Sequence, residues 1–131
     1  MQSARPININ YSTIRLLILI LVMAASSAFA EPKVIITSDE FIERVTDKTL
    51  TRPFIILKVS SDGKIHGTGA FRKITGRWLW QDGYFCRSLR WGRTDLDYNC
   101  QRVTSYGNKL TFTSYRGTGD SASFTLRPTK D

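Results

Sequence analysis

Cysteine and histidine are scarce in this chain of 131 residues, which has two Cys and one His. So few soft ligands exclude the Cys- and His-rich patterns of metal sites. Acidic residues are also few, 11 against 19 Lys and Arg, and the net charge is +8. The hydrophobic share of 41% is that of an ordinary globular protein. The length allows one domain and excludes two-domain dehydrogenases, (β/α)₈ barrels and kinases.

The first 30 residues have the pattern of an export signal. Arg5 and Arg15 make the start positive, ten apolar residues follow Arg15, and an Ala-x-Ala pattern ends at Ala30. The alternative is an uncleaved anchor, but a span needs about 20 apolar residues. We therefore expect cleavage between Ala30 and Glu31, no stable membrane anchor, and a periplasmic or secreted protein. Residues 31–131 are then one β-barrel-like domain.

Cys86 and Cys100 are expected to form a disulfide. Export brings them into an oxidising compartment, and a domain this small benefits from a covalent link. Their spacing has no accompanying His for a metal site and lacks the C-x-x-C of a redox enzyme. The alternative, two buried free thiols, does not suit the periplasm.

One helix is predicted at the start of the domain. Thr37 and Glu40 form a capping box, and the apolar residues that follow, Phe41, Ile42 and Val45, share one face at helical spacing. We expect this helix to end near residues 47–48, with the segment up to Pro53 breaking it.

The chain after Pro53 changes to short strands separated by Asp-Gly and Gly-Asn turn signals. Seven strands are predicted, over residues 54–60, 64–71, 74–80, 84–91, 96–105, 109–115 and 121–127. Because the connections are short, neighbours should pair antiparallel. The expected fold is therefore mainly β: a small up-and-down meander or barrel, lipocalin-like, with one N-terminal α-helix and one disulfide.

The expected disulfide also predicts the strand register. If Cys86 faces Cys100, then Phe85 faces Gln101 and Ser88 faces Tyr98. The Gly-Asn turn similarly sets Tyr106 opposite Lys109 and Val103 opposite Phe112. The resulting core face carries Phe85, Leu89, Trp91, Val103, Leu110, Phe112, Phe124 and Leu126.

Three polar residues share that core face: Arg87, Asn99 and Gln101. Inside a barrel they would form a polar floor or mouth, which suits an anionic or amide-bearing ligand. Two structural alternatives remain open. The three residues lie where the barrel frays into solvent, or Arg87 is neutralised by Asp97 or Asp120.

Other patterns carry weaker signals. His66, Asp120 and Ser121 make a triad on paper, but no G-x-S-x-G accompanies them. Residues 117–122 match G-x-G-x-x-A, yet a strand rather than a helix is expected after them. Aromatic residues interleaved with arginines would suit nucleic acid, but strand cores need such rings too, and export argues against that partner. We expect no catalytic residue, cofactor, metal or nucleic-acid partner.

Residues 76–87 read Gly-Arg-Trp-Leu-Trp-Gln-Asp-Gly-Tyr-Phe-Cys-Arg, and Tyr98-Asn99-Cys100 follow. With Thr49–Pro53, Gly67-Thr68-Gly69 and residues 116–122, this resembles a family of small exported bacterial proteins without established function. Members are often labelled dihydrodipicolinate reductase by automatic transfer. Such a reductase needs a dinucleotide-binding domain, which these residues do not supply. Gly76-x-Trp78 is also similar to the G-x-W of lipocalins and implies similar barrel packing.

Three functions follow from these features. The first is a non-catalytic periplasmic protein that binds a small ligand or an envelope partner. The second is a basic protein that binds anionic envelope polymers. The third is the reductase that the resemblance implies.

Overall fold

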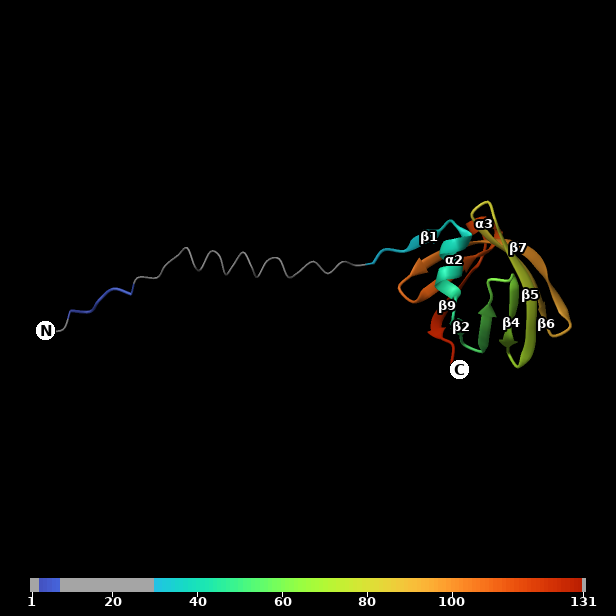
Figure 1. Cartoon of the computed structure of the whole chain (residues 1–131), viewed down its shortest axis with the longest axis horizontal. Helices are drawn as coiled ribbons and strands as arrows, with labels where there is room; N and C mark the ends of the chain where they lie inside the picture. Colours follow the sequence, from blue (N-terminus) through green and yellow to red (C-terminus); the bar gives the residue numbers. More distant parts are fainter. Residues whose placement is uncertain (1–2, 8–29, 131) are drawn as a thin grey trace.

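The computed structural model describes residues 3–7 and 30–130, and most of the expected export signal lies outside them. The described residues form one antiparallel sheet of nine strands (Figure 1). The strands are β1 (Lys33–Ile35), β2 (Lys48–Arg52), β3 (Ile55–Val59), β4 (Lys64–Gly69), β5 (Arg72–Gln81), β6 (Tyr84–Trp91), β7 (Thr94–Tyr106), β8 (Lys109–Thr113) and β9 (Ser121–Pro128). The helical segments are α2 (Ser38–Val45) and the short α3 (Ser114–Gly117).

Eight of these strands close into a barrel. From β2 to β9 each strand pairs with the next, and β9 pairs back with β2 through Leu126 and Leu50. This is the up-and-down order of lipocalins, and it leaves the barrel strands without a free edge. The predicted fold class is therefore confirmed, and the barrel is closed.

The helix α2 covers one end of the barrel. Thr37 caps it by accepting a hydrogen bond from the Glu40 N–H at 3.3 Å, as predicted. Glu40 makes a salt bridge with Lys33 at 2.7 Å. The helix ends at Val45, slightly before the predicted end, because the chain turns at once into β2.

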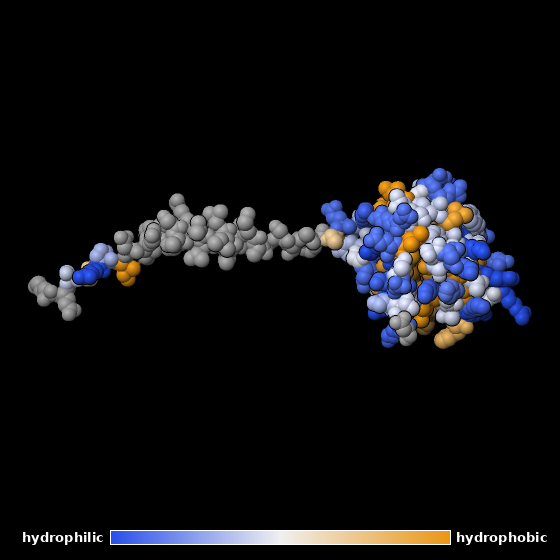
Figure 2. Space-filling view, in the orientation of Figure 1, coloured by the Kyte–Doolittle hydropathy of each residue, from blue (hydrophilic) through white to orange (hydrophobic). Residues whose placement is uncertain are grey.

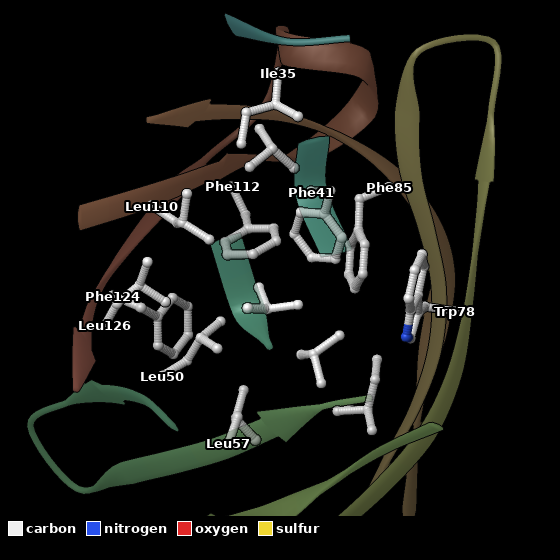
Figure 3. Close-up of a cluster of buried hydrophobic side chains, with 14 of the residues drawn as sticks. Ile35, Phe41, Leu50, Leu57, Trp78, Phe85, Leu110, Phe112, Phe124 and Leu126 are labelled. Atoms are coloured by element: carbon white, nitrogen blue, oxygen red, sulfur yellow. The ribbon is translucent and has the colours of Figure 1, made fainter. Parts of the chain in front are cut away.

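Phe41 fixes α2 to the barrel (Figure 3). Its ring lies 5.0 Å from that of Phe85 and 5.2 Å from that of Trp78, and Phe112 lies on its other side at 6.2 Å. Phe41 is fully buried. A buried aromatic side chain of this size is among the largest single contributions to a small core, so this end of the barrel is filled.

The predicted register is confirmed at most positions. Cys86 pairs with Cys100, Phe85 with Gln101, and Val103 with Phe112. The predicted core face is buried or packed against the core at all eight positions. The core face thus followed from the disulfide and one turn signal.

The regular pairing predicted for Ser88 with Tyr98 is wrong. Beyond Arg87 and Asn99 the next paired residues are Leu89 and Leu96, so β7 has one more residue than β6 over this stretch. Such a β-bulge bends the strand and leaves a backbone group outside the ladder.

Two strands are missing from the prediction, β1 and β2. β1 pairs with β7 beyond the first residues of β6, and β2 occupies residues that were expected to end the helix and break it. Only Leu50 in β2 is fully buried, so its alternation is too weak to mark a strand. The predicted strand 109–115 also ends early, at Thr113, because Tyr115 and Arg116 have positive φ.

Gly76 shows why the Gly-x-Trp pattern occurs in this barrel. A Cβ at Gly76 would overlap the carbonyl of Ser88 and meet the side chain of Leu89 on the neighbouring strand. Trp78, two residues on, is buried and donates from its indole to the Ser60 carbonyl at 2.9 Å. Glycine lets β5 and β6 approach, and the tryptophan ties β5 to the β3–β4 turn.

Cys86 and Cys100 form a disulfide across the β6–β7 hairpin. Replacing either with Ser should lower the free energy of unfolding by about 3 kcal/mol, because the bridge restricts the unfolded chain. Urea titration of the oxidised protein measures this loss. Reduced wild-type protein is the control and should match the variant. Two free thiols in the exported, unreduced protein would contradict the pairing.

Candidate ligand-binding cavity

The barrel encloses a cavity of about 420 Å³. It lies between the core packed under α2 and the opposite end of the barrel. At that opposite end lie the β2–β3, β4–β5 and β6–β7 turns, because strands alternate in direction. Pro53, Phe54 and Ala70 from the first two turns line the cavity at its mouth. The core under α2 fills one end of the barrel. A ligand would therefore enter the cavity from the opposite end, which we call the mouth.

The wall of the cavity is mostly apolar. Inward-pointing side chains alternate along each strand with outward-pointing ones, and the inward set is aliphatic or aromatic. Its apolar members include Leu50, Leu57, Val59, Ile65, Ile74, Phe85, Leu89, Trp91, Phe112 and Phe124. Arg52, Arg87 and Gln101 are the polar residues of the lining, and Trp91 adds an indole N–H that bonds to the Gly69 carbonyl. An apolar pocket with a few polar groups is the usual form of a small-molecule site.

The structure brings the three predicted site residues together. Arg87 and Asn99 are directly opposite on β6 and β7, and Gln101 is two residues from Asn99 on the same strand. Arg87 and Gln101 line the cavity, whereas Asn99 does not. They lie within the barrel rather than in a frayed edge.

Asn99 has a structural role. Its side chain is 9% exposed, and its Oδ1 accepts a hydrogen bond from the Tyr115 N–H at 3.0 Å. Tyr115 has φ of 51°, so the start of the β8–β9 connection is held in the left-handed region by this contact. Asn99 therefore shapes the connection beside the cavity.

Gln101 is held by the same connection. Its Nε2 donates to the Ser114 Oγ at 3.2 Å. Ser114 is the first residue of α3 and directly follows β8. The contact restrains the amide, so Gln101 presents a positioned polar group to the cavity.

Arg87 is a half-buried cation whose partner is a backbone carbonyl. Its Nη1 donates to the Asp97 carbonyl oxygen at 2.6 Å, and Asp97 lies in the β7 bulge. None of the salt bridges within residues 3–7 and 30–130 includes Arg87. Arg87 therefore makes no salt bridge with Asp97 or Asp120 in the described residues, although the charge of Asp97 still acts on it.

Burial lowers the pKa of the Arg87 guanidinium from its ordinary value. The negative charge of Asp97 and the Tyr115 hydroxyl oppose this effect more weakly. An arginine remains protonated under such conditions. The cavity therefore holds a permanent positive charge. Of the N–H donors of this guanidinium, one has a hydrogen-bond partner within the described residues.

Arg52 is a second cation on the lining and was not among the predicted site residues. It ends β2 on the exposed side of the mouth, with its guanidinium 5.6 Å from the centre of the Phe124 ring. The signal that could have found it is the alternation of Leu50 and Arg52, which places both on the inner face once β2 is recognised as a strand.

Trp91 makes two contacts at the mouth of the barrel. The indole of Trp91 donates to the Gly69 carbonyl at 2.7 Å. Arg72 lies over the same ring, 4.7 Å from its centre. These contacts tie Trp91, a lining residue at the end of β6, to the two residues that flank the β4–β5 turn.

The weaker sequence patterns do not come together. His66 is exposed on β4, while Ser121 lies on β9 and exchanges a hydrogen bond of 2.8 Å with Thr113. β3 and β2 separate those strands in the sheet. Residues 117–122 pass from α3 into β9, so a strand follows the glycines as expected. In the described part of the chain no group of three metal-binding side chains occurs.

Comparison with protein-family models, curated proteins and solved structures finds no match for this chain.

Arg87→Met is expected to keep the free energy of unfolding equal or raise it by up to about 1 kcal/mol. The change removes a partly buried charge that makes no salt bridge, and an apolar side chain of similar length suits the wall. Urea titration measures it. Arg77→Met on the exposed face of β5 is the matched control and should change stability by less than about 0.5 kcal/mol. A loss above about 2 kcal/mol for Arg87→Met would assign Arg87 a structural role instead.

Proposed function

We propose that this protein is a non-catalytic binding protein that takes a small ligand into its barrel. The ligand class is an amphiphile with an apolar body and one anionic group. We further propose that it works in the periplasm or outside the cell after removal of residues 1–30. The disulfide supports an oxidising compartment.

The observation that carries the proposal is the charge of Arg87 inside an apolar cavity. Removing a cation from water is unfavourable unless a negative group compensates it. The described residues supply Arg87 with one carbonyl and with the charge of Asp97, but with no salt bridge. A carboxylate, sulfonate or phosphate on a ligand would complete its bonding with charge-assisted hydrogen bonds, which are the strong ones. Gln101 adds an amide next to it.

The size of the cavity agrees with this ligand class. About 420 Å³ lies within the 300–1,000 Å³ of pockets that hold small molecules. The aliphatic and aromatic wall would bury the apolar body, which contributes roughly 25 cal/mol per Å² of apolar surface. The anionic group would reach Arg87, while Arg52 attracts it at the mouth.

A second candidate function is the binding of anionic envelope polymers. The net charge of +8 favours it. Such binding uses exposed cations, so it should fall steeply as salt rises. Binding inside the apolar cavity should depend much less on salt, which separates the two candidates.

Two naphthalene dyes that differ by one charge test the proposal. 1-Anilinonaphthalene-8-sulfonate carries a sulfonate, whereas N-phenyl-1-naphthylamine has the same rings without it. Both should bind wild-type protein. Arg87→Met should weaken the sulfonate dye about 10- to 100-fold and leave the neutral dye unchanged, because only the anion contacts the guanidinium. Fluorescence titration measures both.

Two further variants complete this experiment. Arg77→Met removes the same charge outside the cavity and should change neither titration. Leu89→Trp narrows the cavity and should weaken both dyes, with circular dichroism as the check on folding. Equal loss of both dyes in Arg87→Met, or no effect on either, would contradict the proposed role of Arg87.

If the protein were the reductase that the family label implies, it would bind a nicotinamide nucleotide. Hydride transfer needs a nicotinamide nucleotide, held by a phosphate loop that leads into a helix. Here residues 117–122 lead into β9. We expect no saturable binding of NADH or NADPH at micromolar concentrations in calorimetric titrations. Saturable binding of either nucleotide would support an enzyme instead.

A further inference from the structure

Two phenylalanines at the mouth of the barrel are almost fully exposed. Phe54 in the β2–β3 turn is 80% exposed, and Phe71 in the β4–β5 turn is 98% exposed. Both have positive φ, 64° and 65°. A bulky residue is rarely found in this left-handed region, where glycine or asparagine is favoured. Neither core packing nor backbone preference explains a phenylalanine at these two positions.

The two turns form one surface. The N–H of Ala70 donates to the Phe54 carbonyl at 2.8 Å, and Ile55 pairs with Gly69 directly below. Phe54, Phe71 and the exposed Ile56 line the same hollow on the outside of the barrel. Figure 2 shows apolar residues at the lower edge of the domain, where Figure 1 places the turns after β2 and β4. We call the tip residues Phe54 and Phe71 the aromatic tips.

The wall behind the aromatic tips is strongly basic. Between residues 48 and 81 the chain has one acidic residue, Asp62, which makes a salt bridge with Lys64. The cations of this stretch are Lys48, Arg52, Lys58, Lys64, Arg72, Lys73 and Arg77. Three of them adjoin the tips in sequence: Arg52, Arg72 and Lys73. All three are exposed.

We propose that the mouth of the barrel docks on an anionic lipid surface. The aromatic tips insert among the lipid headgroups, and Arg52, Arg72 and Lys73 contact lipid phosphates. Phenylalanine is among the residues whose apolar side chains bury at the boundary between lipid headgroups and acyl chains. Each basic residue near an anionic membrane strengthens binding by about fivefold. The positive charge of this wall favours an anionic lipid surface over a neutral apolar partner, because lipid phosphates attract the cations.

This geometry has a consequence for the cavity. Pro53, Phe54 and Ala70 line both the cavity and the outer hollow, so the docked surface includes the mouth. An amphiphile could then pass between the lipid layer and the barrel without crossing bulk water. Docking itself requires no ligand, so it goes beyond the proposed function and is tested separately.

Vesicle sedimentation tests the docking. The protein is purified after export, since the strands that the structure describes, α2 and the disulfide all lie within residues 33–128. Vesicles of equal parts phosphatidylglycerol and phosphatidylethanolamine should bind it at least tenfold more tightly than vesicles of phosphatidylcholine. Sodium chloride at about 0.5 M should weaken that binding strongly, because it shortens the Debye length to a few Å.

The decisive variant is Phe54→Asn with Phe71→Asn. Binding to anionic vesicles should fall at least tenfold, while the melting temperature stays equal or rises, because asparagine tolerates positive φ. Ile36→Asn with Tyr106→Asn is the matched control. These residues are 66% and 50% exposed and lie before α2 and at the β7–β8 turn, away from the mouth. This control should bind vesicles like wild type.

Three outcomes would overturn the docking proposal. The first is absence of wild-type binding to anionic vesicles, and the second is equal binding by the aromatic-tip variant. The third is a wild-type dimer in analytical ultracentrifugation that the tip substitutions abolish, which would make the patch an interface between two copies. Arg87→Met separates this proposal from the ligand proposal, because it should keep vesicle binding while losing the sulfonate dye.

Discussion

The pairing of β2 with β9 closes the sheet, and the cavity exists only because of that closure. Leu50 and Leu126 face each other across it, and both are buried in the core. In an open meander the inner faces of β2 and β9 would be exposed at two edges. Closure joins the first and last strands of the barrel, so the inner faces of all eight strands share one interior.

The two ends of that interior differ because of α2. The helix fills one end with Phe41, whose ring meets those of Trp78 and Phe85. The turns after β2, β4 and β6 bound the other end, and the short α3 lies in the β8–β9 connection. In the described part of the chain no helix is long and apolar enough to cross a membrane. The barrel thus has a packed half that provides stability and a hollow half that remains open to a ligand.

Several features in the hollow half of the barrel lower the stability of the folded state. Arg87 brings a charge into an apolar wall, and the bulge in β7 interrupts the ladder beside it. Phe54 and Phe71 hold positive φ at the mouth while their rings face solvent. Strained or poorly compensated groups tend to gather where a protein binds something. Here all of them lie between the middle of the barrel and its mouth.

Much of this fold was predictable because its signals are local. The cap at Thr37, the turn signals and the pairing of Cys86 with Cys100 each involve residues close in the chain, and together they placed the inner face. β2 and its contact with β9 were not predictable, because one buried leucine is a weak strand signal and the partner lies far along the chain. The sequence also placed Arg87 on the inner face. Only the tertiary structure decided which groups compensate the charge of Arg87. Arg87 lies on β6, and those groups come from the bulge in β7 and from the β8–β9 connection, which are brought together only in the folded barrel.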